Sequence, residues 1–204
     1  MSWNTHDFES ISKREGYPLL LTAVVPRPIG WVSSRSEVGV ANLAPFSWVN
    51  AVCAQPYLVG VSVARRRGRP KDTAANVLET GEFVVNIVGE SALEAMVRTS
   101  IDHPPEVDEI RESGLTEMAS ETVRAPRVAE SPVHLECRLE KSLVFGEDAV
   151  DWLLGRVTRL HVHESVLAED GRVCAEALRP VCRLGRDEDA VIDEILRVPR
   201  PEAP

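Results

Sequence analysis

Short runs of apolar and β-branched residues recur along the first half of the chain, separated by proline, glycine and charged residues. These runs predict β-strands over residues 19–25, 29–33, 40–49, 57–64 and 83–88. The run at 57–64 is almost wholly apolar, which predicts a strand buried on both faces. Pro45 interrupts the run at 40–49, so we expect that segment at a sheet edge, because proline cannot donate a ladder hydrogen bond.

The second half of the chain alternates more regularly between apolar and polar residues. Within residues 133–143, Val133 and Leu135 would face inward while His134 and Glu136 face solvent. This pattern predicts a half-exposed antiparallel strand, and residues 151–166 and 172–181 predict further strand segments. Many short strands with few helices favour a mainly β fold, an antiparallel barrel or sandwich with peripheral helices.

Two short helices are predicted between the strands. The first is capped by Asp72 or Thr73 and ends before Gly81, a residue suited to the left-handed conformation at a helix end. The second opens with a capping box of Ser91 and Glu94 and runs to about residue 98. Residues 100–132 are rich in proline and charge, which predicts a loop with one helical turn that would suit a flap over a site.

Length and hydropathy favour one soluble domain. The chain has 204 residues, enough to bury a full core. We expect residues 1–185 to form one domain and the acidic, proline-containing tail at 186–204 to be partly disordered. No apolar run of about 18 residues is present, so no membrane partner is expected. The N-terminus lacks the pattern of a secretory signal, and a cytoplasmic protein is therefore expected.

The net charge of −9 argues against nucleic acid as the main partner, because a phosphate backbone demands a basic surface. One exception is the segment Arg-Arg-Arg-Gly-Arg-Pro-Lys at residues 65–71, which could hold a small anion. The four cysteines form no C-x-x-C pair and have no histidine cluster beside them. Neither a metal site nor disulfide bonds are therefore expected.

The segment at residues 26–34 offers one guanidinium and two hydroxyls. Arg27 could pair with phosphate oxygens, and Ser33 and Ser34 could bond a phosphate or a polyol. On spacing alone, however, a plain hairpin with a proline-fixed start is the better interpretation.

The segment at residues 42–48 places Asn42 and Ser47 among apolar positions beside Phe46 and Trp48. Polar groups next to aromatic rings suit a flat ligand with polar edges. An edge strand with core aromatics explains the same pattern equally well.

The third segment is the predicted helix start at residues 71–73. A helix N-terminus offers free N–H donors, to which Lys71 adds a charge and Thr73 a hydroxyl, so a phosphate would be well held. The alternative is an ordinary capped helix with a solvated basic loop. No Walker loop, G-x-G-x-x-G fingerprint, nucleophile elbow or H-E-x-x-H motif supports other chemistry.

In this order, the three segments resemble the flavin reductase-like proteins with an FMN-binding split β-barrel. The matching text is PRPIGWVSS (26–34), VANLAPFSW (40–48), YLVGVSVA (57–64) and KDTAANVLETGEFVVNIV (71–88). A fainter similarity continues through 130–142, 153–165 and 178–186. The resemblance implies a six-stranded antiparallel split barrel with flanking short helices, and a homodimer with FMN near its interface.

The resemblance also implies an NAD(P)H-dependent flavin reductase, with NADH or NADPH as electron donor and a monooxygenase as partner. Two alternatives stay open. One is an FMN-dependent oxidoreductase or oxygenase with its own small organic substrate, and the other is a non-catalytic FMN-binding or storage protein. No catalytic side chain is assigned, because in hydride transfer the flavin carries the chemistry.

The resemblance carries cofactor-binding roles onto individual residues. The phosphate is expected against Lys71, Thr73 and Arg27. Ser33 and Ser34 would serve the phosphate or the ribityl chain, and the ring edge would meet residues 42–47. Many relatives have a second glycine and an aromatic after Arg-Leu-Gly, but here residues 183–185 are followed by Arg186 and no aromatic. The residues implied to bind FMN are Arg27, Ser33, Ser34, Asn42, Ala44, Pro45, Phe46, Ser47, Ser62, Lys71 and Thr73.

Overall fold

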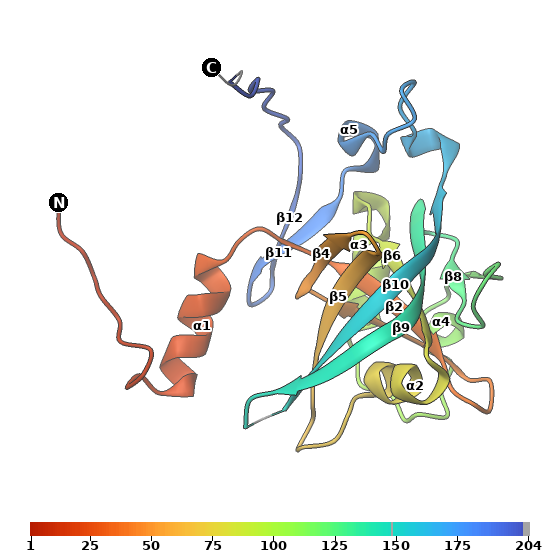
Figure 1. The fold of residues 1–204 in the computed structure, drawn as a ribbon, viewed down its shortest axis with the longest axis horizontal. Helices are drawn as coiled ribbons and strands as arrows, with labels where there is room; N and C mark the ends of the chain where they lie inside the picture. The colour runs from red at the N-terminus through yellow and green to blue at the C-terminus, as the bar shows by residue number, and fades with distance from the viewer. Residues whose placement is uncertain (148, 202–204) are drawn as a thin grey trace.

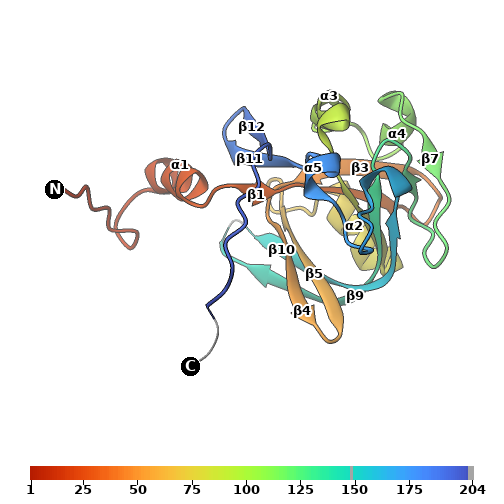
Figure 2. The same ribbon diagram turned by 90° about the horizontal axis from the view of Figure 1, so that it is seen from above.

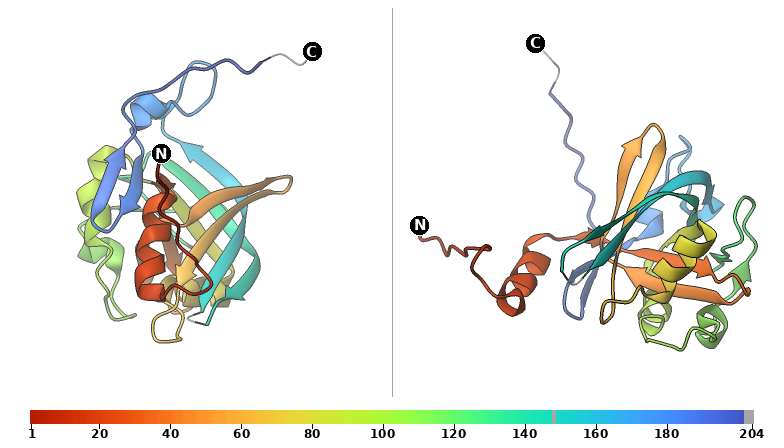
Figure 3. Two further views of the ribbon diagram at one scale, coloured as in Figure 1. Left: turned by 90° about the vertical axis from the view of Figure 1, so that its left-hand side faces the viewer. Right: turned by 60° about the horizontal axis from the view of Figure 1, so that its bottom comes forward.

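The computed structural model describes residues 1–147 and 149–201. A seven-stranded antiparallel sheet forms the body of the molecule, with strand order β3-β2-β6-β9-β10-β5-β4 (Figure 1). It curls around a core that takes side chains from both ends of this order, among them Val32 of β2 and Val61 of β5 (Figure 3). The strands are β2 (Gly30–Arg35), β3 (Ala41–Phe46), β4 (Val49–Ala54), β5 (Tyr57–Ala64), β6 (Glu82–Ile87), β9 (Val133–Phe145) and β10 (Val150–Val162).

Smaller elements surround this sheet. A three-stranded sheet joins β1 (Arg27–Pro28), β11 (Val181–Gly185) and β12 (Glu188–Val191), and β7 (Glu117–Met118) pairs with β8 (Arg127–Val128). Helix α1 (Lys13–Ala23) lies beside the β11–β12 hairpin and projects from the body (Figure 2). The other helical elements are α2 (Asp72–Thr80), η1 (Glu90–Ala92), α3 (Leu93–Arg98), α4 (Glu109–Glu112), η2 (Glu164–Val166) and α5 (Ala175–Leu178).

Strand β2 separates two apolar clusters, because successive side chains of a strand point to opposite faces. Val32 belongs to the cluster inside the curled sheet. Trp31 belongs to a second cluster under α3 and α4, where its indole N–H donates to Thr99 Oγ1 at 2.8 Å. The second cluster holds the segment after α3 against the sheet, and this segment reaches the candidate site.

Several predictions are confirmed. Strand β5 has the predicted bounds, β6 covers most of residues 83–88, and Pro45 lies in the edge strand β3. Helix α2 ends before Gly81, whose φ of +72° is the left-handed conformation expected there. The mainly β class is also confirmed, with seven strands in the large sheet rather than six.

The strand predicted at residues 19–25 is wrong, because most of it belongs to helix α1. Ser12 is the N-cap of this helix. The backbone N–H of Glu15 donates to Ser12 Oγ at 3.4 Å, and Ser12 Oγ donates to Glu15 Oε2 at 2.5 Å. The S-x-x-E pattern at residues 12–15 is a sequence signal for a helix start, and the prediction from the apolar run did not use it.

Three other local predictions are also wrong. Helix α3 has Ala92 as its N-cap, and the box of Ser91 and Glu94 does not form among the described residues. Helix α2 is capped by Lys71, whose side chain makes no cap hydrogen bond in the part of the chain described. Residues 172–181 pair only through isolated bridges of Val173 and Pro180 and through Val181 at the start of β11, and α5 lies between them.

His134 and Glu136 of β9 were predicted to face solvent, yet they are 6% and 0% exposed. The backbone N–H groups of Glu121 and Thr122 donate to the Glu136 carboxylate at 2.8 and 2.7 Å. The long loop before β9 therefore covers this face of the strand. Nothing in the alternation along β9 itself could indicate that cover.

The segment after residue 185 continues the fold, because β12 pairs with β11. Residues 202–204 of the tail predicted at 186–204 lie outside the described residues. Among the helices described, none combines the length and the apolar character needed to cross a membrane.

Candidate functional site

Three adjoining hollows lie along β3, the start of β4 and the N-terminus of α2. Their volumes are about 100, 340 and 500 Å³. The first two share Pro45, Phe46, Lys71 and Ser100 in their walls. The second and third share Arg27, Ser47, Trp48 and Ser62. Together they offer a continuous stretch of surface long enough for an extended ligand with one flat end.

The structure brings all but two of the predicted cofactor-binding residues to these hollows. Strand β3 and the turn after it contribute the largest share, and β5 places Ser62 next to them through its backbone N–H, which donates to Trp48 O at 2.9 Å. The predicted residues in the walls are Arg27, Asn42, Ala44, Pro45, Phe46, Ser47, Ser62, Lys71 and Thr73.

Ser33 and Ser34 lie outside the walls of these three hollows. Both are fully buried, because β2 lies between β3 and β6 and has covered faces. Ser33 Oγ donates to the carbonyl of Pro126, and Ser34 Oγ accepts from Asn76 Nδ2 at 3.1 Å. A contact of either hydroxyl with a ligand would require these partners to move.

The smallest hollow opens at the N-terminus of α2. Asn42 Nδ2 donates to Thr73 Oγ1 at 3.2 Å, which joins two predicted residues from β3 and α2. The first N–H groups of a helix have no intrahelical acceptor, and Lys71 supplies no side-chain cap within the described residues. These donors and the Lys71 ammonium would suit a phosphate group.

Carboxyl groups surround the same hollow. Asp72, Asp102 and Glu109 all line it, and Arg66 pairs with Asp102 at 2.8 Å. Burial raises the pKa of Glu109 to about 7, and the nearby Asp72 and Asp102 also raise it, although the hydrogen bond from Leu43 acts against them. An anion would therefore bind best where Glu109 is protonated.

Arg27 links three elements at the edge of the two larger hollows. Its Nη1 donates to the carbonyls of Leu21 in α1, Val24 after it and Leu184 in β11. The side chain is 5% exposed, and its Nε finds no acceptor among the described residues. A buried donor without an acceptor is costly, and because protein atoms cover the Nε, a ligand could accept from it only if those atoms moved.

The residues that line these hollows fit a flavin mononucleotide on chemical grounds. Phe46, Trp48 and Pro45 provide apolar and aromatic area for a flat ring. The α2 N-terminus and Lys71 provide the positive end for a phosphate. A single ligand carrying both a planar ring and an anion matches this surface.

Sequence reasoning missed part of the wall. Tyr17 and Leu21 come from α1, Arg186 from the turn after β11, and Ser100 from the loop after α3. The S-x-x-E pattern at residues 12–15 could have indicated α1 as a helix. No linear signal places that helix or the C-terminal hairpin next to β3, because these contacts are distant in sequence.

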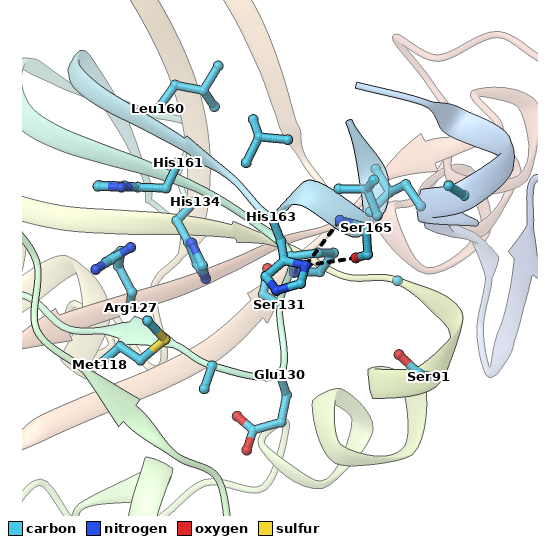
Figure 4. A pocket seen from close by; sticks show the side chains of 17 residues that line it. Ser91, Met118, Arg127, Glu130, Ser131, His134, Leu160, His161, His163 and Ser165 are labelled. Carbon is cyan, nitrogen blue, oxygen red and sulfur yellow. Dashed lines mark hydrogen bonds between the residues drawn. The ribbon is translucent and has the colours of Figure 1, made fainter. Parts of the chain in front are cut away.

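A separate hollow of about 700 Å³ lies at the far end of β9 and β10 (Figure 4). Its walls include His134, His161 and His163, but much of their hydrogen-bonding capacity is used internally. His163 Nδ1 accepts from the Ser165 backbone at 3.2 Å, and His161 Nε2 lies 2.7 Å from Glu136 Oε1. The described residues contain no metal-binding cluster of histidine, cysteine or carboxylate groups.

The sequence model of the flavin reductase like domain matches residues 22–177. The chain belongs to the flavin reductase-like family. The predicted resemblance is thus confirmed, and so is the split-barrel class of the fold. A flavin-related oxidoreductase follows from family membership.

Relatives of the chain include an uncharacterized protein of Halalkalibacterium halodurans, 46% identical over 95% of this chain and 94% of that protein. Nitrilotriacetate monooxygenase component B from Bacillus cereus is 38% identical, with a TM-score of 0.93 over 97% of this chain and 100% of that one. The 2-nitrobenzoate 2-nitroreductase NbaA of Pseudomonas fluorescens is 28% identical, with a TM-score of 0.88 over 97% and 96% of the two chains.

Proposed function

We propose that this protein is an NAD(P)H-dependent flavin reductase that binds FMN in the hollows along β3. The observation that carries the proposal is the convergence of an aromatic wall and the uncapped start of α2 on one continuous surface. These groups match the ring and the phosphate of one molecule.

In this proposal, the phosphate lies against Lys71, the first N–H groups of α2 and the hydroxyl of Thr73. The isoalloxazine edge meets Asn42, Ser47 and the backbone of residues 44–46, while Ser62 contributes its backbone. Ser33 and Ser34 act through their neighbours. Ser34 positions Asn76 of α2, and Ser33 holds the segment at Pro126, so both support the walls from behind.

The bound flavin supplies the hydride acceptor in this chemistry. The reduced nicotinamide would supply the hydride and solvent the proton, which together would give oxidised nicotinamide and reduced flavin. The side chains of this protein bind and orient the two molecules and limit water at the reacting atoms. No acid–base side chain is required, and we assign none.

We further propose that the reduced flavin passes to a partner monooxygenase. The similarity to nitrilotriacetate monooxygenase component B, which covers nearly the whole chain, supports this role. NADH and NADPH are both candidate donors, and a cytoplasmic location would supply either one.

A homodimer with FMN near its interface is part of the proposal. An apolar hollow of about 590 Å³ lies between the β4–β5 hairpin and β10, lined in part by Tyr57, Leu58 and Leu160. Tyr57 and Leu160 are well exposed in the single chain. A second copy that covered these side chains would remove apolar surface from water.

The second candidate is an FMN-dependent oxidoreductase with its own small organic substrate, favoured by the similarity to a 2-nitrobenzoate 2-nitroreductase.

One assay separates the candidates. The purified protein is examined for bound flavin and then mixed with NADH or NADPH and free FMN. Rapid oxidation of one donor with release of reduced FMN supports the reductase. Tightly held flavin that turns over only with an added nitroaromatic or related acceptor favours the second candidate, and no turnover with any of them favours storage.

A further inference from the structure

Helix α1 lines the middle hollow together with several of the predicted cofactor residues. Tyr17 and Leu21 are four residues apart, so they lie on one face of the helix, and both line the hollow. Tyr17 remains 51% exposed, and Trp48, which lines the same hollow, is 42% exposed. Two large aromatic side chains thus stay half uncovered around one space.

The position of α1 is set by contacts with β11. Arg27 Nη1 donates to carbonyls of both elements, at 3.0 Å to Val24 and 3.0 Å to Leu184. Thr22 also approaches Gly185 so closely that a Cβ there would lie 2.8 Å from Thr22 Cγ2. The helix is therefore held against the hairpin, and Tyr17 is presented to the hollow from a supported element.

The rest of that wall cannot supply an aromatic cover. The hairpin contributes Arg183 and Arg186, and no phenylalanine, tyrosine or tryptophan follows Trp152 in the sequence. No ring contact joins Tyr17 to Trp48 within the described part of the chain. Tyr17 lines the hollow and is half exposed, so a planar ligand there could contact its ring.

We propose that Tyr17 covers the bound flavin by packing its ring on the isoalloxazine. This assignment rests on the proposed function. Aromatic rings gain from offset stacking beyond the area they bury, and tyrosine loses little conformational freedom when it packs. Tyr17 would thus set affinity for the flavin ring, whereas Lys71 sets affinity for its phosphate.

The test compares Tyr17→Phe, which keeps the ring, with Tyr17→Leu, which removes it but retains a good helix former. FMN and riboflavin are titrated into each protein, and visible circular dichroism of the bound flavin is recorded. We expect Tyr17→Leu to raise the Kd of both flavins about fivefold and change the dichroism, and Tyr17→Phe to remain within about twofold of wild type. Leu20→Ala, on the same helix outside this wall, is the matched control and should bind normally.

The outcomes are distinct. Wild-type affinity and dichroism in a folded Tyr17→Leu variant would overturn the role of Tyr17 while leaving the proposed function intact. Equal losses in Tyr17→Leu and Leu20→Ala would also overturn it, since they would indicate only that α1 had been disturbed. Failure of the wild-type protein to bind either flavin would instead refute the proposed function itself.

Discussion

The carboxyl group of Glu109 in α4 accepts a hydrogen bond of 2.7 Å from the backbone N–H of Leu43 in β3. This contact attaches the loop after α3 to the edge strand that forms much of the candidate site. The carboxyl is buried near Asp72 and Asp102, and its pKa is raised to about 7. The protonation of one side chain is thereby coupled to the stability of the fold and to the charge of the hollow.

We expect the free energy of unfolding to contain a Glu109 contribution that declines as the pH rises. Because the native pKa exceeds the unfolded value, the native state holds the proton more tightly between pH 4.5 and about 7. The contribution of Glu109 to the free energy of unfolding is therefore fully present below pH 4.5 and is lost as the pH rises to about 7. Thermal unfolding of wild type and Glu109→Gln across pH 5–8 should diverge, with the variant relatively more stable at pH 8. Parallel curves would contradict this coupling.

The same group should affect the proposed phosphate site. At pH 8 an ionised Glu109 places a negative charge in the hollow that contains Lys71. Glu109→Gln should therefore bind FMN more tightly than wild type at pH 8, with the difference shrinking toward pH 6. Isothermal titration at both pH values checks this, and riboflavin, which lacks the phosphate, should show a much smaller difference. An equal effect on both flavins would place the phosphate elsewhere.

Lys71→Ala should weaken FMN binding about tenfold, because a charge-assisted contact to the phosphate would be lost. Lys141→Ala is a matched control, since Lys141 is exposed on β9 and outside the walls of the candidate site. Fluorescence titrations with FMN and riboflavin provide the measurement. Unchanged FMN affinity in Lys71→Ala would remove Lys71 from the site.

Glu136 should be a major source of acid sensitivity. Burial alone would raise its pKa, but hydrogen bonds from Thr122, Glu121 and His161 outweigh burial and lower it to about 2. The resulting stabilisation is present above pH 4.5 and is lost as the pH falls toward 2. It is on the order of 3 kcal/mol, and Glu136→Gln should lose most of it at pH 7.

Chemical denaturation at pH 7 and pH 3 measures this effect. The gap between wild type and Glu136→Gln should be wide at pH 7 and narrow at pH 3. A gap independent of pH would mean that packing, rather than charge, accounts for the effect of the substitution.

Gly155→Ala should destabilise the fold by about 3 kcal/mol through overpacking. A Cβ at Gly155 would overlap Phe83 Cζ and lie 2.8 Å from its Cε1, inside the core of the curled sheet. Urea unfolding measures the loss. Phe83→Leu combined with Gly155→Ala should recover part of the stability relative to the sum of the single changes, and strict additivity would argue against the predicted clash.

The amino-acid pattern by itself determined those strands whose burial can be inferred from their own residues. The apolar run of β5 and the proline in edge strand β3 need no distant partner to be interpreted. The same holds for α2, where Gly81 marks the end and Lys71 and Thr73 stand at the start. The order of these segments also sufficed to indicate the family, and with it the residues that line one continuous surface.

Only the tertiary structure decided which side chains face that surface. Ser33 and Ser34 look available in the sequence, but β2 is an interior strand and neighbours cover both of its faces. Glu136 looks exposed by alternation, yet a loop that precedes it in the chain supplies its hydrogen bonds. No motif in the sequence around Tyr17 predicts a binding site, because contacts between α1 and β11 are what bring Tyr17 to the hollow. Burial and proximity arise from segments far apart in the chain, and local periodicity contains no information about them.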